Sequence, residues 1–130
     1  MKIVIPIPPV SKSRPRFANG HAYTPKKTRE YEEAVRNIAK SAIISPLQGE
    51  IRLAIDFYMS IPNSWSKAKK QQAMIGEIRP ATRPDIDNLC KAIMDALNGG
   101  VGYDDDSQIV ELHLREWYGE PRTEIELEEL

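Results

Sequence analysis

Alternation between apolar and more polar residues over positions 51–59 is the feature that most constrains the fold. The apolar positions are Ile51, Leu53, Ile55, Phe57 and Met59. Because successive side chains of a β-strand point to opposite faces, this pattern predicts a strand with one buried face. The chain is therefore expected to build a sheet around this segment.

Two stretches have the apolar spacing of amphipathic helices. In residues 31–42 apolar side chains recur every three or four positions until Pro46, and Thr24-Pro25 supplies an N-cap followed by proline at the first helical position. A second stripe over residues 86–97 is stopped by Gly99-Gly100. A short helix is expected after Ser64-Trp65.

The remaining segments complete an α+β chain. Residues 2–7 are expected to form an edge or first strand, residues 8–23 a proline-rich loop, and residues 110–115 and 125–127 two more strands. A turn at residues 119–121 makes those last two strands a predicted hairpin. The expected order is β-α-β-(α)-α-β-β in one domain, residues 1–130, with helices packed on a mixed sheet.

Composition narrows the class of protein. The chain of 130 residues is 41% hydrophobic and 28% charged, which is typical of globular proteins rather than disordered ones. Its one cysteine excludes an intramolecular disulfide, and its apolar runs are shorter than the ~20 residues of a membrane span. A cytoplasmic protein with no membrane partner is expected.

Charge divides sharply along the chain. Residues 1–80 carry 14 basic and 6 acidic side chains, whereas residues 81–130 carry 4 basic and 13 acidic ones. Such asymmetry favours a polyanion-binding surface beside an acidic site, although mutual attraction of the two parts in a folded monomer explains the charge equally simply.

The acidic residues are ordered rather than scattered. Asp87, Lys91 and Asp95 stand four residues apart and therefore share one face of the predicted helix, with Asp85 at its start. Residues 104–106 are three consecutive aspartates whose mutual repulsion a hard cation such as Mg²⁺ would relieve.

Simpler interpretations of these acids stay open. Asp85 alone is typical of a helix N-cap, Asp95 with Lys91 of a solvated ion pair, and residues 104–106 of a turn. Spacing excludes an EF-hand at both acidic clusters. In a loop that starts at Asp85 the sixth position, which requires glycine, is Cys90; in a loop that starts at Asp104 the twelfth position, which requires glutamate, is Arg115. Whether Asp106 lies beside Asp85 and Asp87 depends on the fold.

Two motifs stand out in the acidic part of the chain. Residues 83–98 carry the long pattern D-x-D-N-L-x-K-x-x-x-D-A-L, and residues 105–110 read DDSQIV. With these motifs the chain resembles RusA-type Holliday-junction resolvases. Residues 12–16 and 23–28 resemble the basic opening of the same family, so the resemblance covers nearly the whole chain.

The resemblance implies a fold, an activity and a set of site residues. The family's members are homodimers, often encoded by bacteria, phages or prophages, that cut four-way DNA junctions with Mg²⁺ in recombination and repair; Mn²⁺ is a candidate substitute. Asp85, Asp87 and Asp106 are implied as catalytic metal ligands, with Asp105 as a further candidate ligand. Lys91 is implied as an essential basic residue.

These residues suit phosphodiester hydrolysis. Carboxylate-held Mg²⁺ lowers the pKa of an attacking water, and an ammonium at Lys91 would stabilise transition-state charge. Asp95 is expected to support Lys91. A four-way junction has two-fold symmetry and this chain carries one acidic set, which also favours a homodimer.

Basic residues outside this set are predicted to contact DNA phosphates. The candidates are Lys12, Arg14, Arg16, Lys26, Lys27, Lys67, Lys69 and Lys70. Phe17, Tyr23 and Trp65 are candidates for stacking on unpaired bases, although burial in a local cluster is the simpler expectation.

Two other functions remain open at this stage. One is a non-catalytic DNA-binding protein whose acids only balance its bases. The other is a D-x-D metal enzyme acting on nucleotides. Metal-dependent cleavage of branched DNA separates both from a junction-resolving nuclease.

Overall fold

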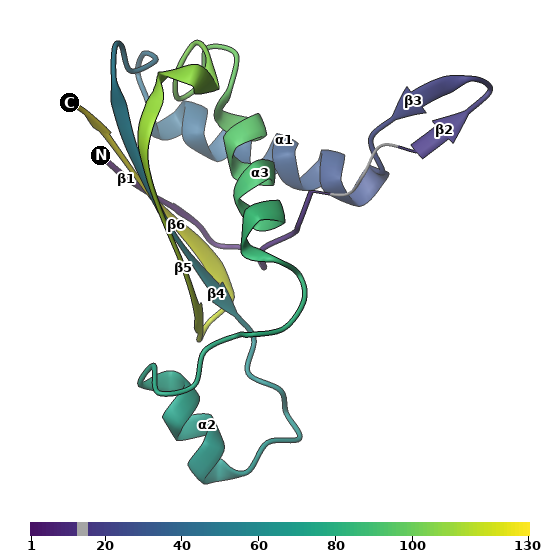
Figure 1. Cartoon of the computed structure of the whole chain (residues 1–130), viewed down its shortest axis with the longest axis vertical. Helices are drawn as coiled ribbons and strands as arrows, with labels where there is room; N and C mark the ends of the chain where they lie inside the picture. Colours follow the sequence, from purple (N-terminus) through teal and green to yellow (C-terminus); the bar gives the residue numbers. More distant parts are fainter. Residues whose placement is uncertain (13–15) are drawn as a thin grey trace.

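The computed structural model describes residues 1–12 and 16–130 as a four-stranded sheet with two helices on one face (Figure 1). The elements in chain order are β1 (Lys2–Ile5), β2 (Arg16–Ala18), β3 (His21–Tyr23), α1 (Lys26–Ala42), β4 (Ile51–Met59), α2 (Lys67–Met74), α3 (Ile86–Leu97), the 3-10 helix η1 (Asp106–Gln108), β5 (Ile109–Tyr118) and β6 (Arg122–Glu129). The expected α+β class with a mixed sheet is confirmed.

The strand predicted at residues 51–59 is β4, and it lies inside the sheet. The strand order is β1-β6-β4-β5, with β4 parallel to β5 and antiparallel to β6. Ile51, Leu53, Ile55 and Phe57 are at most 1% exposed on the face that the helices cover. Its apolar face thus forms the floor of the core.

The predicted hairpin of the last two strands is wrong. β5 and β6 do not pair with each other, because β4 lies between them and bonds to both. The turn at residues 119–121 instead passes over the end of β4, where the Gly119 N–H donates to the Met59 carbonyl at 2.9 Å. An interior position lets β4 pair its backbone on both edges, a requirement that a turn signal does not reveal.

The two long helices cover the inner face of the sheet. α1 contributes Tyr31, Val35 and Ala39 to the core, and α3 contributes a stripe that includes Leu89 and Ile93. α1 begins one residue later than expected, since Pro25 and not Thr24 occupies its N-cap. Both helices otherwise follow their predicted apolar spacing.

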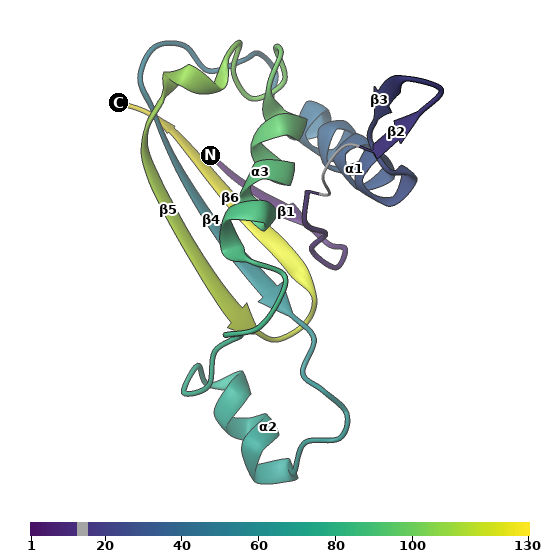
Figure 2. The ribbon, with the colours of Figure 1, turned by 45° about the vertical axis from the view of Figure 1, so that its right-hand side comes forward.

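A small hairpin interrupts the expected loop at residues 8–23. β2 and β3 pair antiparallel across Asn19 and Gly20, whose φ angles of 52° and 77° suit the tight turns of two-residue hairpins. The hairpin projects beside the start of α1 and away from the sheet (Figure 2). The Asn-Gly pair was the available signal, and the prolines around it concealed it.

The short helix α2 lies at the opposite end of the molecule from the β2–β3 hairpin (Figures 1 and 2). Ser66 caps it by accepting from the Lys69 N–H at 3.2 Å. Trp65 packs edge-on against Tyr118 of β5, with ring centroids 5.1 Å apart. Among the described residues no helix has the length and apolar character needed to cross a membrane.

Candidate active site and nucleic-acid interface

The predicted acidic helix start is formed by α3. Asp85 occupies its N-cap position in an extended conformation, but its carboxylate makes no capping hydrogen bond. Asp87 lies in the first turn, where the positive end of the helix dipole favours a carboxylate. Both side chains are exposed, so both carboxylates are accessible to a ligand.

A groove of about 320 Å³ runs between α3 and β5. Its polar lining comes from Asp87, Lys91 and Asp95 on one face of α3 and from Asp106 of η1. Leu112 and Leu114 of β5 form its opposite wall. The groove therefore joins three of the four predicted catalytic residues: Asp87, Lys91 and Asp106.

The loop after α3 determines where Asp106 lies. The Gly102 N–H donates to the Leu97 carbonyl at 2.9 Å, and the buried Tyr103 hydroxyl donates to the Met94 carbonyl at 2.8 Å. Burial raises the pKa of Tyr103, and the negative charge of nearby Asp106 raises it further. These contacts fold the chain back so that η1 lies beside the groove.

Asp85 lines a neighbouring cavity of about 540 Å³ together with Asp87, Arg83 and Glu116. Asp87 thus borders both cavities. Within residues 1–12 and 16–130, however, no three acidic, histidine or cysteine side chains are grouped closely enough to hold a metal by themselves. Asp85 and Asp106 accordingly line different cavities, and Asp87 lies between them as a member of both linings.

Glu116 is an acid at this site that the sequence reasoning missed. Burial and the charge of Asp85 raise its pKa, while Arg79 opposes the shift. The alternation of residues in β5 could have predicted its position, because Glu116 follows Leu112 and Leu114 on the inward-facing side of the strand.

Asp105 has a structural role in this arrangement. Its carboxylate caps η1 by accepting from the backbone N–H and the hydroxyl of Ser107, and Gln108 completes a capping box. The hydrogen bonds from Ser107 lower the pKa of Asp105. Asp104 lies apart from the groove, in a shallow cavity next to Gln108 and Val110.

The expected pairing of Lys91 with Asp95 is not formed. Asp95 instead pairs with Lys12, whose Nζ lies 3.2 Å from its Oδ2 and 2.6 Å from Glu32 Oε1. Lys12, with a side chain only 17% exposed, is therefore not available as the free phosphate contact that the sequence predicts. Lys91 is exposed and makes no ion pair with the described residues.

A known protein family matches nearly the whole chain. The family model described as endodeoxyribonuclease RusA matches residues 6–128. The chain belongs to the RusA endodeoxyribonuclease family. It is also 36% identical over 132 residues to the uncharacterized protein YqaN of Bacillus subtilis (strain 168), covering 94% of this chain and 91% of that protein.

Membership of the RusA family establishes a nuclease that acts on DNA, and nucleases of this family generally depend on divalent metals. A nuclease has to approach a polyanion, so the positions of the basic side chains matter. Lys26 and Lys27 are exposed at the start of α1, beside the hairpin. Lys67 and Lys69 are exposed on α2, and Lys70 is half-buried there.

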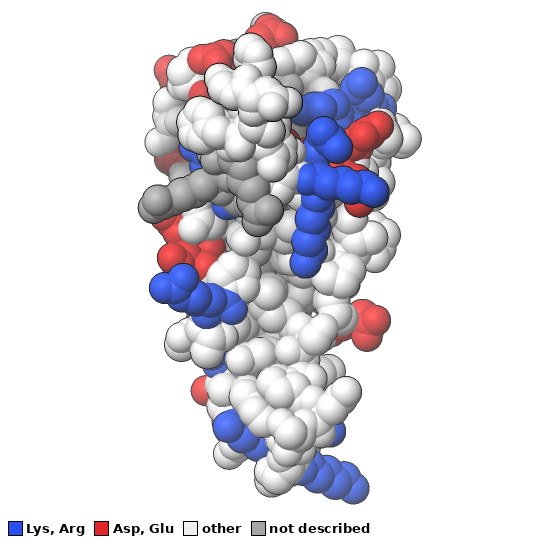
Figure 3. All heavy atoms as spheres, turned by 90° about the vertical axis from the view of Figure 1, so that its right-hand side faces the viewer, with Lys and Arg blue, Asp and Glu red and all other residues white. Residues whose placement is uncertain are grey.

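These cations lie at two ends of the RusA-family domain. Figure 3 shows Lys and Arg atoms over the upper half of one face and again at the lower tip, where α2 lies. Arg14 lies outside the described residues, and Arg16 is described only through its backbone in β2. In the chain, α3 with its acidic face follows both of these basic elements.

The aromatic candidates differ from one another. Phe17 and Tyr23 are 77% and 45% exposed on the hairpin, so the expected burial in a local cluster is wrong for both. Trp65 is half-buried, with the Lys69 ammonium 4.0 Å from its ring centroid. Of these three aromatic candidates, the two on the hairpin are the exposed ones.

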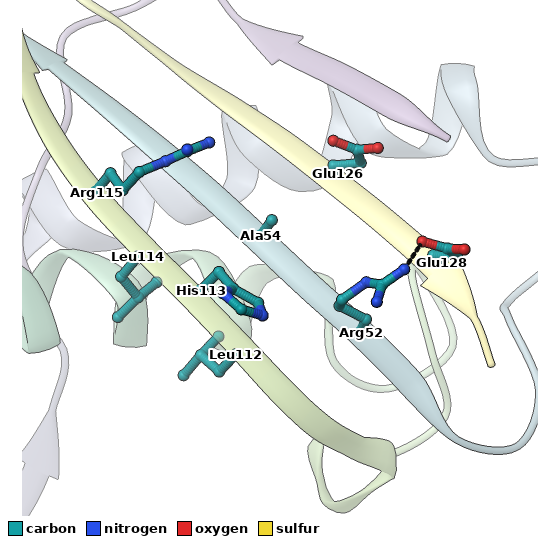
Figure 4. Close-up of a pocket in the computed structure, with 8 residues that line it drawn as sticks. All are labelled: Arg52, Ala54, Leu112, His113, Leu114, Arg115, Glu126 and Glu128. Carbon is teal, nitrogen blue, oxygen red and sulfur yellow. Dashed lines mark hydrogen bonds and ion pairs between the residues drawn. The ribbon is translucent and has the colours of Figure 1, made fainter.

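The largest cavity described, about 620 Å³, is on the outer face of the sheet and not at the carboxylates (Figure 4). Its arginines are already neutralised: Arg52 pairs with Glu111 and Glu128, and Arg115 pairs with Asp56 at 2.7 Å. Because these charges compensate one another, this cavity has little attraction for DNA.

Proposed function

We propose that this protein is a Mg²⁺-dependent, structure-selective endodeoxyribonuclease that resolves four-way DNA junctions in recombination and repair. The observation that carries the proposal is the groove in which Asp87, Lys91 and Asp106 meet without ion-pair partners among the described residues. Unpaired charges in one groove are suited to a ligand that carries both a cation and a phosphate.

The carboxylates fit a hard divalent cation. Mg²⁺ is usually bound by one or two carboxylates and keeps several waters or phosphate oxygens, so it needs no closed protein cage. Asp87 would hold such an ion with Asp85 at the start of α3 or with Asp106 in the groove, and waters and phosphate oxygens would complete the coordination. When bound, the ion would neutralise the scissile phosphate and lower the pKa of the attacking water.

The side chains of the groove have distinct parts in this proposal. Lys91, one turn beyond Asp87, offers an unpaired ammonium to the non-bridging phosphate oxygens and stabilises their growing charge. Asp105 would keep Asp106 in place through its capping of η1 rather than bind the metal directly.

Two basic elements support binding of branched DNA. Lys26 and Lys27 near the hairpin and the lysines of α2 are far apart, so they would hold different arms of a junction through phosphates. Phe17 would stack on unpaired bases. Two matched incisions require two sets of catalytic residues, and a homodimer would supply them. Cytoplasmic location and a bacterial or phage origin remain predictions from the sequence.

Metal-dependent cleavage of a synthetic four-way junction tests this function. We expect nicked products with Mg²⁺, slower or altered cleavage with Mn²⁺, and none with EDTA. Binding without cleavage in either metal would identify a non-catalytic DNA-binding protein. Hydrolysis of free nucleotides without salt-sensitive junction binding would identify a nucleotide enzyme.

A further inference from the structure

Lys12 differs from the other predicted DNA-binding lysines in its surroundings. Its side chain is 17% exposed, compared with 78% for Lys26. Its ammonium lies between two carboxylates, Glu32 of α1 and Asp95 of α3. Although burial alone would lower the pKa of Lys12, its hydrogen bonds to these two carboxylates raise it.

Lys12 also fixes the chain after β1 to the helix that carries the site. Its backbone N–H donates to the Asn88 carbonyl, in the first turn of α3, at 2.9 Å. Arg36 of α1 strengthens the same region by donating to the Ala96 carbonyl at 3.2 Å. Lys12 is thus held against both helices through its backbone and its side chain.

The ion pair at Lys12 determines what Asp95 can do. Asp95 stands four residues after Lys91 and lines the same groove, so the two side chains are able to pair across one helical turn. Asp95 instead lies 3.2 Å from the Lys12 ammonium, and the Lys91 ammonium remains unpaired among the described residues.

We propose that Lys12 is a positioning residue that keeps Asp95 away from Lys91. By neutralising Asp95, it leaves the Lys91 ammonium free for a phosphate and removes an uncompensated negative charge from the groove. The catalytic consequence rests on the proposed nuclease function, whereas the effect on Lys91 does not.

Chemical labelling of lysines tests the proposal without requiring activity. Mass spectrometry after brief acetylation would compare Lys91 with Lys67 as an internal reference. In Lys12→Met, Asp95 becomes free to pair with Lys91, and an ion pair of this kind should slow Lys91 acetylation roughly twofold. Lys12→Met combined with Asp95→Asn should restore the original rate, and Lys40→Met serves as the exposed control.

Cleavage kinetics supply the second measurement. Lys12→Met should lower kcat on a junction with little change in KM, and the double variant should recover kcat. Asp95→Asn alone, which keeps the Lys12–Glu32 pair, removes the carboxylate that could pair with Lys91, so it should leave the Lys91 acetylation rate unchanged. If Lys12 contacted DNA instead, Lys12→Met would raise KM and Asp95→Asn would not restore it.

Particular results would overturn the proposal. An unchanged Lys91 acetylation rate in Lys12→Met, or no recovery in the double variant, contradicts it. A changed Lys91 acetylation rate in Asp95→Asn alone contradicts it as well, because Lys91 would then already be paired with Asp95 in the unmodified protein. If the unmodified protein cuts no junction, the proposed function fails while the labelling result still decides the role of Lys12.

Discussion

At the scale of single residues, Asp87 is the most informative position. It borders both cavities at the start of α3: it lines one cavity with Asp85, and it lines the groove with Lys91 and Asp106. The sequence pattern singled out these four residues, and the structure places Asp87 in one groove with Lys91 and Asp106 and in a neighbouring cavity with Asp85. It could not reveal that Asp95 pairs with Lys12, because that contact joins residues brought together only by tertiary packing.

Asp87→Asn should abolish cleavage while leaving junction binding unchanged or tighter. The substitution keeps the size of the side chain but removes the charge that holds a cation and repels phosphate. Single-turnover cleavage and a binding titration measure the two effects. Asp104→Asn, in the same acidic region but outside the groove, is the matched control and should cleave normally.

Asp105→Ala should lower the melting temperature and reduce cleavage less than Asp87→Asn does. Hydrogen bonds lower the folded-state pKa of Asp105. Its stabilising contribution is therefore complete above the unfolded-state pKa of 3.8 and is lost as the pH falls through the lower folded-state value. Thermal unfolding at neutral and at acidic pH should show the difference from the unmodified protein narrowing; a constant difference would contradict the capping role.

At the scale of elements, strand and helix positions follow from the sequence but strand pairing does not. The alternation in β4 and the stripes of α1 and α3 are local properties of amphipathic segments. The partner of each strand depends on the whole sheet, which is why β4 lies between β5 and β6 contrary to expectation. The projecting hairpin was missed because prolines outweighed its Asn-Gly turn.

Phe17→Ala on this hairpin should weaken junction binding without altering thermal stability. Its ring is 77% exposed, so its removal costs little folding energy. Stacking on a base contributes about 1–3 kcal/mol, which corresponds to roughly a 5- to 150-fold loss of affinity. Ile44→Ala, at a fully exposed apolar residue away from the hairpin, is the control, and equal losses in both variants would exclude a specific stacking role.

At the scale of the whole molecule, the divided charge of the sequence has two structural outcomes. Part of it is neutralised on the outer face of the sheet, where Glu124 pairs with Lys2 and Arg122, and Arg52 pairs with Glu128. Ion pairs between basic residues of 1–80 and acidic residues of 81–130 are therefore part of the folded monomer. Lys67 and Lys69 of α2 and the carboxylates of Asp85 and Asp87 make no ion pair with the described residues, which leaves their charges accessible to ligands.

Replacing Lys67, Lys69 and Lys70 by glutamine should weaken binding to every DNA with little regard to sequence. Each lost phosphate contact reduces the slope of log affinity against log salt concentration by about 0.9. Titrations between low and moderate salt measure this slope. Lys40→Gln, at the other end of α1 from the hairpin, should leave it unchanged.

The relative rate of cleavage of a four-way junction and of a linear duplex built from the same strands tests the central claim most directly. With Mg²⁺, we predict that the junction is cut much faster than the duplex, at symmetrically placed positions on two opposing strands, and that EDTA stops the reaction. Equal cleavage of both substrates, or tight junction binding with no cleavage in any divalent metal, would contradict the account.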